Sequence, residues 1–138
     1  MKRKGTYVLF LHFLSDLEIE VGSLGHIFLS AGWYCYVGSA MGGLDQRVSR
    51  HLAHSKTVRW HIDRLTLKAD EMFAMEHEGD SITECTLGRI LEGAGAEPAA
   101  EGFGCSDCTC RTHLFRAEPD GAVRALASRG LTKFVDKR

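Results

Sequence analysis

One stretch decides the fold: Tyr36-Val37-Gly38-Ser39-Ala40, followed after Gly42-Gly43 by Leu44-Asp45-Gln46-Arg47-Val48-Ser49-Arg50-His51. Its first part predicts an extended segment that ends in a glycine turn. Its second part predicts a helix over residues 44–54, with Asp45 in the first turn, where the helix dipole favours an acid. The stretch therefore predicts a strand, a tight turn and a helix in immediate succession.

Arg47 and His51 lie one turn apart on this helix, at the edge of the stripe formed by Leu44, Val48 and Leu52. Side chains four residues apart on a helix are neighbours, so both could contact one phosphate. Arg47 would supply a planar fork for the phosphate oxygens, and His51 a second donor or a proton carrier. The alternative is that Arg47 pairs with a carboxylate and His51 is a half-buried structural histidine.

Outward from this stretch, strand and helix patterns alternate. Residues 6–13 are apolar on both faces, which predicts a central strand. Strands are also predicted at 18–21, 26–29, 33–37, 72–75 and 112–117, helices at 58–65 and from 79–81 to about 91, a linker at 93–102, a turn at 118–121, and a final strand or helix. Segments 26–29 and 33–37 are expected to pair around 30–32. The expected class is α/β (α+β): a small, mainly antiparallel sheet of about three central strands flanked by helices, with an inserted hairpin at 18–29.

Length and composition limit the organisation of the chain. Its 138 residues, 44% of them hydrophobic, predict one domain over 1–138, with a Cys/His-rich C-terminal extension from about residue 102. No apolar run approaches the roughly 20 residues of a membrane span, so we expect a cytoplasmic protein without a membrane partner. Five cysteines without a secretory signal favour free thiols or a metal site over disulfides.

Charge is unevenly distributed although the net charge is only -1. Residues 47–68 are rich in Arg, Lys and His, whereas residues 70–101 are rich in acids. A basic half beside an acidic half is expected of a polyanion surface next to a cation site, although solvated helices would look the same. The residues expected to contact nucleic acid are Gly38, Ser39, Arg50, Lys56, Arg59 and His61.

Glu84 has two interpretations. Ser81-Ile82-Thr83-Glu84 fits a capping box, in which the glutamate satisfies the first amide of a helix. A glutamate in the first turn of a helix can also hold a hard divalent cation while waters and substrate oxygens complete the shell. The sequence leaves both open.

A second dense cluster, Cys105, Cys108, Cys110 and His113, contains the ligand types of tetrahedral zinc. The two-residue interval between Cys108 and Cys110 is tighter than in zinc fingers. Buried thiols in a tight loop, or a redox-sensitive cluster, are the alternatives to Zn²⁺.

Taken together, these residues resemble the GIY-YIG nuclease family, and in particular its small stand-alone Uri-type endonucleases. Gly5-Thr6-Tyr7 resembles the first signature strand and Tyr36-Val37-Gly38 the second. Trp60-His61-Ile62-Asp63 and the stretch from Gly102-Phe103-Gly104 to His113 are also similar to Uri-type sequences. The chain differs from the family in the 28 residues that separate Tyr7 from Tyr36, and it contains no asparagine.

The resemblance implies a metal-dependent endonuclease that hydrolyses DNA phosphodiester bonds, with RNA not excluded. Tyr7, Tyr36, Arg47 and His51 would be catalytic, and Glu84 would hold one Mg²⁺ or Mn²⁺ ion. Either tyrosine, set opposite the other across two paired strands, would orient or deprotonate the attacking water. The alternatives are a nucleic-acid-binding or repair accessory module without catalysis, and a zinc-stabilised interaction domain. The sequence leaves the oligomeric state open.

Overall fold

The computed structural model describes residues 2–104 and 111–136, and its centre is a six-stranded sheet. The sheet order is β6-β7-β4-β1-β5-β8, and every pairing is antiparallel. The strands are β1 (Gly5–Phe13), β4 (Gly32–Ala40), β5 (Glu71–Glu78), β6 (Glu97–Pro98), β7 (Leu114–Arg116) and β8 (Thr132–Lys133). The mainly antiparallel α/β class is confirmed, but the expected three central strands were too few. The short strands β6 and β8 carry only two residues each, too few for a period-2 pattern to be recognised.

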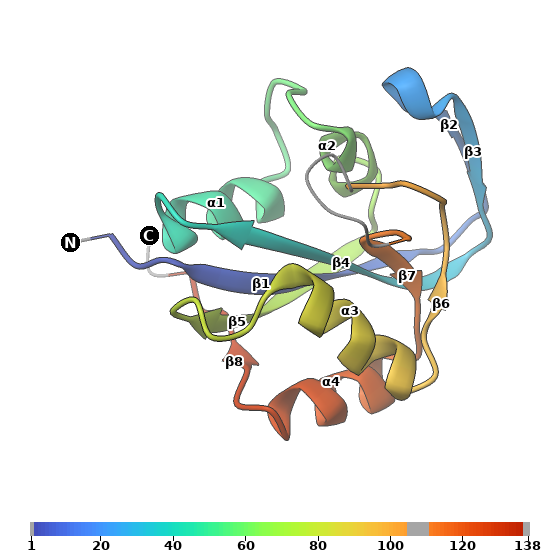
Figure 1. Cartoon of the computed structure of the whole chain (residues 1–138). Helices are drawn as coiled ribbons and strands as arrows, with labels where there is room; N and C mark the ends of the chain where they lie inside the picture. Colours follow the sequence, from blue (N-terminus) through green and yellow to red (C-terminus); the bar gives the residue numbers. More distant parts are fainter. Residues whose placement is uncertain (1, 105–110, 137–138) are drawn as a thin grey trace.

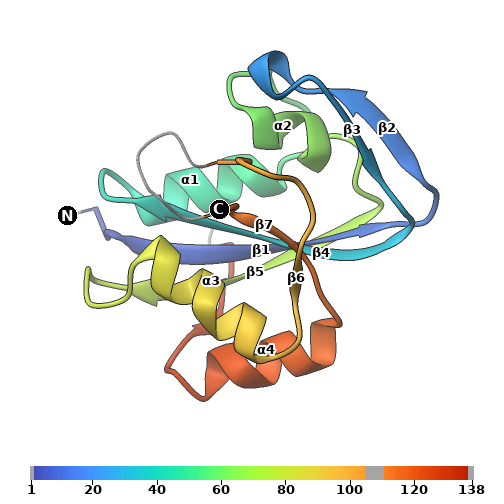
Figure 2. The same cartoon turned by 45° about the vertical axis from the view of Figure 1, so that its right-hand side comes forward.

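The central strand β1 is buried on both faces, as its continuous apolar sequence predicts. Tyr7, Leu9 and Leu11 point to one core and Val8 and Phe10 to the other, because successive strand residues face opposite ways. Helices α1 (Leu44–Leu52) and α2 (His61–Thr66) cover the first face, and α3 (Glu84–Gly93) and α4 (Pro119–Ala127) cover the second (Figures 1 and 2). We call these the α1/α2 face and the α3/α4 face.

The inserted hairpin predicted at 18–29 is confirmed, but its pairing was only partly foreseen. β2 (Leu17–Glu20) and β3 (His26–Leu29) form a separate two-stranded sheet joined by a 3₁₀ turn at Gly22–Leu24. β3 therefore does not pair with β4, which instead lies between β1 and β7. β4 has buried residues on both faces and belongs in a sheet centre, whereas β3 is largely exposed. The hairpin lies beside α2 (Figure 1).

Helix boundaries differ from the predicted ones where local patterns were weak. The helix at 44–54 is confirmed as α1, which ends at Leu52. The predicted helix at 58–65 begins only at His61, and the one expected from 79–81 begins at Glu84. The predicted turn at 118–121 is the start of α4, with Pro119 in its first turn, where a missing N–H costs nothing. The linker at 93–102 contains β6, which pairs with β7.

Over the residues that the structure describes, no helix has the length and apolar character needed to cross a membrane.

Candidate active site

A pocket with a volume of about 430 Å³ lies on the α1/α2 face. Four residues that the sequence predicts to act together, Tyr7, Tyr36, Arg47 and His51, all line it. They come from β1, β4 and α1, so the strand, turn and helix of the opening stretch bring them to one place. The two tyrosines are diagonal neighbours and not directly opposite, because Tyr7 pairs with Gly38 and Tyr36 with Leu9.

Tyr7 and His51 form a buried hydrogen-bonded pair. Tyr7 Oη lies 2.8 Å from His51 Nε2, and the two residues are only 2% and 1% exposed. Gly38 makes room for this pair, since a Cβ at that position would lie within 2.4 Å of Tyr7 Oη. The glycine of Tyr36-Val37-Gly38 is therefore required by packing against the tyrosine of the neighbouring strand.

Burial keeps both members of this pair uncharged. It raises the pKa of Tyr7 above its ordinary value, and Tyr36 and Glu84 add to the increase while Arg47 opposes it. Burial also lowers the pKa of His51 to about 3, and the nearby charge of Lys56 acts in the same direction. At neutral pH the pair is thus a phenol and a neutral imidazole.

Arg47 is partly exposed at the pocket wall. Its Nη1 donates to the carbonyl oxygen of Ser39 at 3.3 Å, and its guanidinium lies 4.7 Å from the centre of the Trp60 ring. These contacts hold the guanidinium beside the pocket. Within residues 2–104 and 111–136, no carboxylate pairs with Arg47, in contrast to the alternative that the sequence left open.

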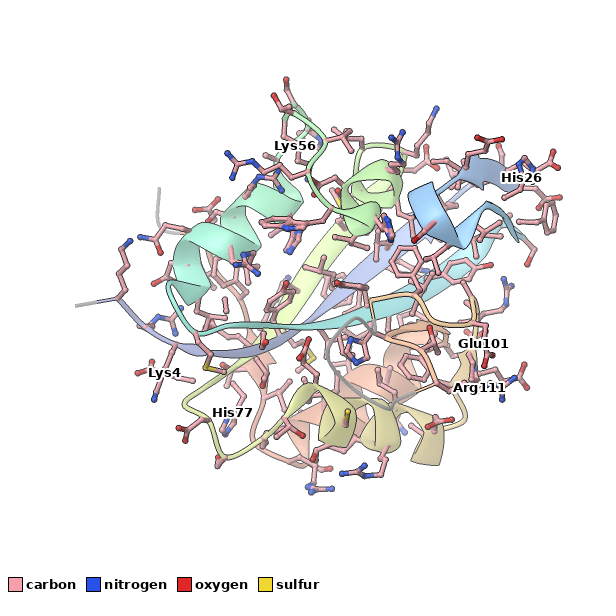
Figure 3. The ribbon with its side chains drawn as sticks, turned by 45° about the horizontal axis from the view of Figure 1, so that its top comes forward. Lys4, His26, Lys56, His77, Glu101 and Arg111 are labelled. Carbon is pink, nitrogen blue, oxygen red and sulfur yellow. The ribbon has the colours of Figure 1, made fainter. Side chains whose placement is uncertain are left out.

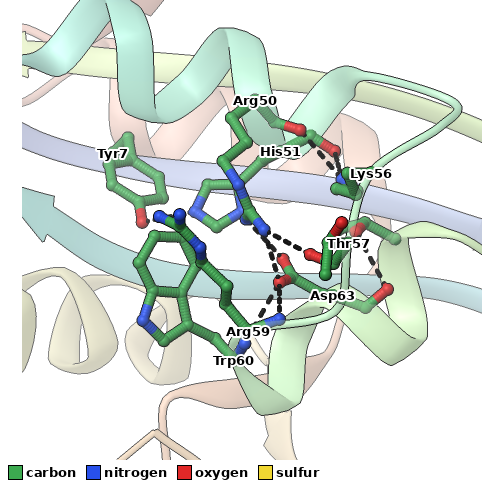
Figure 4. Close-up of polar contacts among 9 residues, drawn as sticks. Tyr7, Arg50, His51, Lys56, Thr57, Arg59, Trp60 and Asp63 are labelled. Atoms are coloured by element: carbon green, nitrogen blue, oxygen red, sulfur yellow. Dashed lines mark hydrogen bonds and ion pairs between the residues drawn. The ribbon is translucent and has the colours of Figure 1, made fainter.

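Arg50 and Lys56, predicted to contact nucleic acid, are engaged within the protein (Figure 4). Arg50 donates to both carboxylate oxygens of Asp63, at 2.9 and 3.0 Å, and stacks 4.5 Å from the Trp60 ring centre. Lys56 Nζ donates to the carbonyl oxygens of Arg50 and His51 at the end of α1. Burial lowers the pKa of Lys56. Both cations therefore have structural partners at this end of α1.

Asp63 organises this corner of the pocket, and sequence reasoning missed its role. Its side chain is fully buried and also accepts from the amides of Arg59 and Trp60, at 2.8 and 3.1 Å. Burial alone would raise the pKa of Asp63, but the hydrogen bonds from Arg50 and the two amides outweigh it and hold the pKa below its ordinary value. The only sequence signal was a single acid in a basic segment.

Arg59 and His61, two of the residues predicted to contact nucleic acid, also line the pocket. The inserted hairpin closes this side, where a Cβ on Gly22 would lie 2.7 Å from His61 Nε2. Ser23 and Leu24 of the same turn also line the pocket. The insertion that separates the two tyrosines in sequence is therefore a wall of the site.

Glu84 lies outside this pocket, at the start of α3. The predicted capping box is wrong, because Thr83 is the N-cap and its hydroxyl accepts from the amide of Thr86 at 3.2 Å. Glu84 lines a neighbouring pocket of about 200 Å³, with its Oε2 3.7 Å from His113 Nδ1. A Cβ on Gly104 would lie 3.1 Å from His113 Cβ and 3.2 Å from Tyr36 Cε1, so the two pockets meet at Gly104.

Of the four predicted zinc ligands, the structure describes only His113. Cys105, Cys108 and Cys110 lie outside the described residues. His113 is buried beside Glu84, and burial lowers its pKa while the glutamate charge partly opposes the shift. Residues 2–104 and 111–136 contain no group of three or more His, Cys, Asp or Glu side chains that could hold a metal ion. Arg111 and Glu101 form an exposed ion pair in the same part of the chain, with Arg111 Nε 2.9 Å from Glu101 Oε2 (Figure 3).

Comparison with protein families gives a match that covers most of the chain. The family described as a domain of unknown function, DUF123, matches residues 6–134. The chain belongs to the DUF123 family. The comparisons with curated proteins and with solved structures find no match.

The DUF123 match spans every strand and helix from β1 to β8. It therefore includes the pocket and Glu84 together. Within this DUF123 domain, sequence reasoning missed Trp60 and Phe103 as lining residues that fix the positions of others. Aromatic residues in loops carry no periodic signal, so only packing shows which side chains they contact.

Proposed function

We propose that this protein is a metal-dependent endonuclease that hydrolyses DNA phosphodiester bonds through a site of the GIY-YIG type. The observation that carries the proposal is the convergence of Tyr7, Tyr36, Arg47 and His51 on one pocket, with Glu84 in the adjoining one. Two phenols, a guanidinium and an imidazole that meet in a concave site are the kind of arrangement expected of a reaction centre.

Arg47 is suited to bind the scissile phosphate. It keeps a permanent charge, lies beside the pocket, and is held by a carbonyl oxygen and an aromatic ring instead of a carboxylate. A guanidinium so placed can donate to two phosphate oxygens and stabilise the charge that develops during in-line attack. Arg59, also at the pocket wall, adds positive potential for a polyanion.

Tyr7 and His51 are suited to orient a hydrogen bond. Nδ1 of His51 is buried and has no hydrogen-bond partner among the described residues. A tautomer protonated at Nε2 would leave only a lone pair unpaired at Nδ1, which costs less than a buried N–H without an acceptor. We therefore assign Nε2–H as the donor to Tyr7 Oη. The Tyr7 proton is then directed toward the pocket, where it can be donated to a phosphate oxygen.

Tyr36 is the better candidate to orient the attacking water. It is partly exposed at the junction with the Glu84 pocket, whereas the buried Tyr7 has a raised pKa that disfavours loss of its proton. The sequence alone left open which tyrosine acts on the water, and the different burial of the two side chains favours a separate role for each. Tyr7 stabilises charge on the phosphate, and Tyr36 positions the nucleophile.

Glu84 could hold a divalent ion if oxygen atoms of the substrate and waters supplied the other ligands. A partly exposed carboxylate is a suitable hard ligand, but the described residues bring no group of three or more His, Cys, Asp or Glu side chains that could hold the ion without substrate. Mg²⁺ is commonly bound by one or two carboxylates together with waters and substrate phosphates. Such an ion would supply Lewis-acid stabilisation of the phosphate oxygens. The contribution of the chain is the carboxylate, fixed at the start of α3 by the bond from Thr6 Oγ1 to the carbonyl oxygen of Ile82 at 3.1 Å.

The direct test is plasmid nicking with Mg²⁺ or Mn²⁺ by the intact protein and by Tyr36→Phe and Glu84→Gln. Each substitution removes a group from the reaction centre, so we expect activity to fall by about 100-fold or more. Tyr34→Phe, two residues earlier on β4, and Glu71→Gln, at the exposed start of β5 and outside both pockets, are matched controls that should retain most activity. Absence of metal-dependent nicking by the intact protein would refute the assignment.

The scarcity of described metal ligands favours one alternative, a nucleic-acid-binding module without cleavage. Such a module would bind DNA with a steep dependence on salt and show no nicking with either ion. A zinc-stabilised interaction domain stays a prediction, because three of its four proposed ligands lie outside the described residues. Unfolding by a chelator, without any DNA binding, would identify that third class.

A further inference from the structure

The pocket beside Arg47 extends well beyond the space that a phosphate group occupies. Its volume of about 430 Å³ falls within the range of roughly 300–1,000 Å³ that is typical of sites for whole organic ligands. The polar groups Tyr7, Arg47 and His51 come from β1 and α1, whereas Leu24, His61 and Phe103 come from three other segments. The pocket therefore has a polar part suited to a phosphate and a largely aromatic part that offers a phosphate no hydrogen-bond donors comparable to Arg47.

The aromatic part has the geometry of a slot. Phe103 is fully buried and contacts Tyr36 edge-on, with ring centres 5.9 Å apart and planes at 85°. His61 meets the same ring at 6.2 Å and 61°. Tyr36 and His61 are both partly exposed, and their rings line the same space as Phe103. Planar heteroaromatic ligands favour such a space, because stacking is available from more than one side.

The inserted hairpin forms one wall of this slot. Leu24 lies against the loop at Gly102, where a Cβ would be 3.6 Å from Leu24 Cδ2, and His61 packs on Gly22. Without residues 22–24 the aromatic part would be open to solvent on that side. The hairpin thus shapes the same pocket that Arg47 lines.

We propose that the aromatic part of this pocket holds the base of one unpaired nucleotide whose phosphate contacts Arg47, so that the preferred substrate is DNA with an unpaired nucleotide at the cleaved position. This inference rests on the proposed endonuclease function and adds its substrate class. A base paired within a duplex has its Watson–Crick edge engaged and both faces stacked, so it cannot enter the slot unless it is first extruded. An unpaired base enters without that cost.

The experiment compares cleavage of a matched duplex with cleavage of the same duplex carrying one extra unpaired thymidine. We expect cleavage next to the unpaired thymidine to be at least about tenfold faster, since extrusion of a paired base costs a few kcal/mol. Leu24→Trp, which fills the slot, should abolish most of this preference. Leu14→Trp is the matched control, because Leu14 is 70% exposed and lies outside the pocket. Equal rates on the two duplexes would overturn the proposal.

Calorimetric titration separates this inference from the endonuclease assignment. Thymidine 5′-monophosphate should bind at least about tenfold more tightly than inorganic phosphate, because only the nucleotide adds base stacking. Leu24→Trp should lose this difference and Leu14→Trp should keep it. If the protein cleaves no DNA but shows this difference, the nucleotide site stands and the endonuclease assignment fails. If the nucleotide binds no better than phosphate to a protein without activity, the nucleotide site fails as well.

Discussion

The two faces of the central sheet are built from alternate residues of the same strands, yet they differ in what they bury. On the α1/α2 face the helices bury Ser49, His51, Asp63 and Thr66. On the α3/α4 face the buried helix residues are Leu87, Gly88, Leu91, Ala122 and Leu126, all without polar side chains. The helices of the α1/α2 face add buried polar groups to their apolar contacts, whereas the buried residues of the α3 and α4 helices make apolar contacts alone.

The difference explains where a reaction site could form. Buried polar groups fix geometry through directional hydrogen bonds: His51 bonds to Tyr7, and Asp63 accepts from the amide of Trp60, so that Tyr7 and Trp60 are held at the pocket. The α3/α4 face contributes only Glu84, from the first turn of a helix whose remaining buried surface is apolar. Removal of a buried polar side chain is therefore expected to weaken the α1/α2 face, whereas the buried residues of α3 and α4 include no polar side chain to remove.

The largest expected effect is loss of the buried Asp63 carboxylate. Asp63→Ala leaves Arg50 and two amides without their acceptor, so we expect the free energy of unfolding to fall by about 3–5 kcal/mol in urea denaturation. Asp80→Ala is the control, because its pair with Lys4 is exposed and should contribute about 0.5 kcal/mol or less. Similar losses for both variants would remove the contrast between buried and exposed pairs.

Acid should weaken the α1/α2 face through His51. The pKa of His51 falls from 6.5 to about 3 on folding, so between these values the unfolded chain binds a proton that the folded chain excludes. The free energy of unfolding therefore decreases as pH falls through this window, by roughly 2–3 kcal/mol at pH 4.5 relative to pH 7. His51→Gln should remove this part of the pH dependence, measured by urea midpoints at both pH values. His54→Gln, an exposed neighbour, should leave the dependence unchanged.

A smaller effect is expected where the two signature strands touch. Gly38→Ala places a methyl group within 2.4 Å of Tyr7 Oη and forces the buried ring away from His51. We expect a loss of about 1–3 kcal/mol, typical of overpacking, together with reduced nicking. Gly42→Ala has nothing within 4 Å of its new methyl group and serves as the control in thermal denaturation. An unaffected Gly38→Ala variant would show that Tyr7 can move at little cost.

The smallest effects test the start of α3. Thr83→Ala removes the observed N-cap and should cost about 1 kcal/mol in urea denaturation. Ser81→Ala and Glu84→Gln should each change the free energy of unfolding by about 0.5 kcal/mol or less, because neither caps the helix. A large loss in either would restore the capping interpretation of Glu84. A small loss with strongly reduced nicking would support its role as a metal ligand.

Much of the fold was predictable from the sequence because it rests on local patterns. The run at residues 6–13 is apolar on both faces and became β1, and the glycine turn before Leu44 was followed by α1 as expected. The convergence of Arg47 and His51 on the same side of α1 also followed from helical spacing. These features depend on residues within one or two turns of each other.

Other features could not be read from the chain in that way. β6 and β8 are too short to show a period, and the partner of β3 is decided by burial across the whole sheet. The engagement of Arg50 with Asp63 joins residues 13 positions apart through a loop. No local pattern predicts which of several basic side chains will pair with Asp63, the one buried acid among the described residues.

The sequence by itself determined that β1 is central, that a glycine turn leads into α1, and that Arg47 and His51 share one side of that helix, since hydrophobic periodicity and turn chemistry act over a few residues. Only the tertiary structure decided that Tyr7 meets His51, that the inserted hairpin closes the pocket, and that Glu84 lies across Gly104 in a separate one. These contacts join segments far apart in the chain, and their geometry depends on the packing of both sheet faces at once.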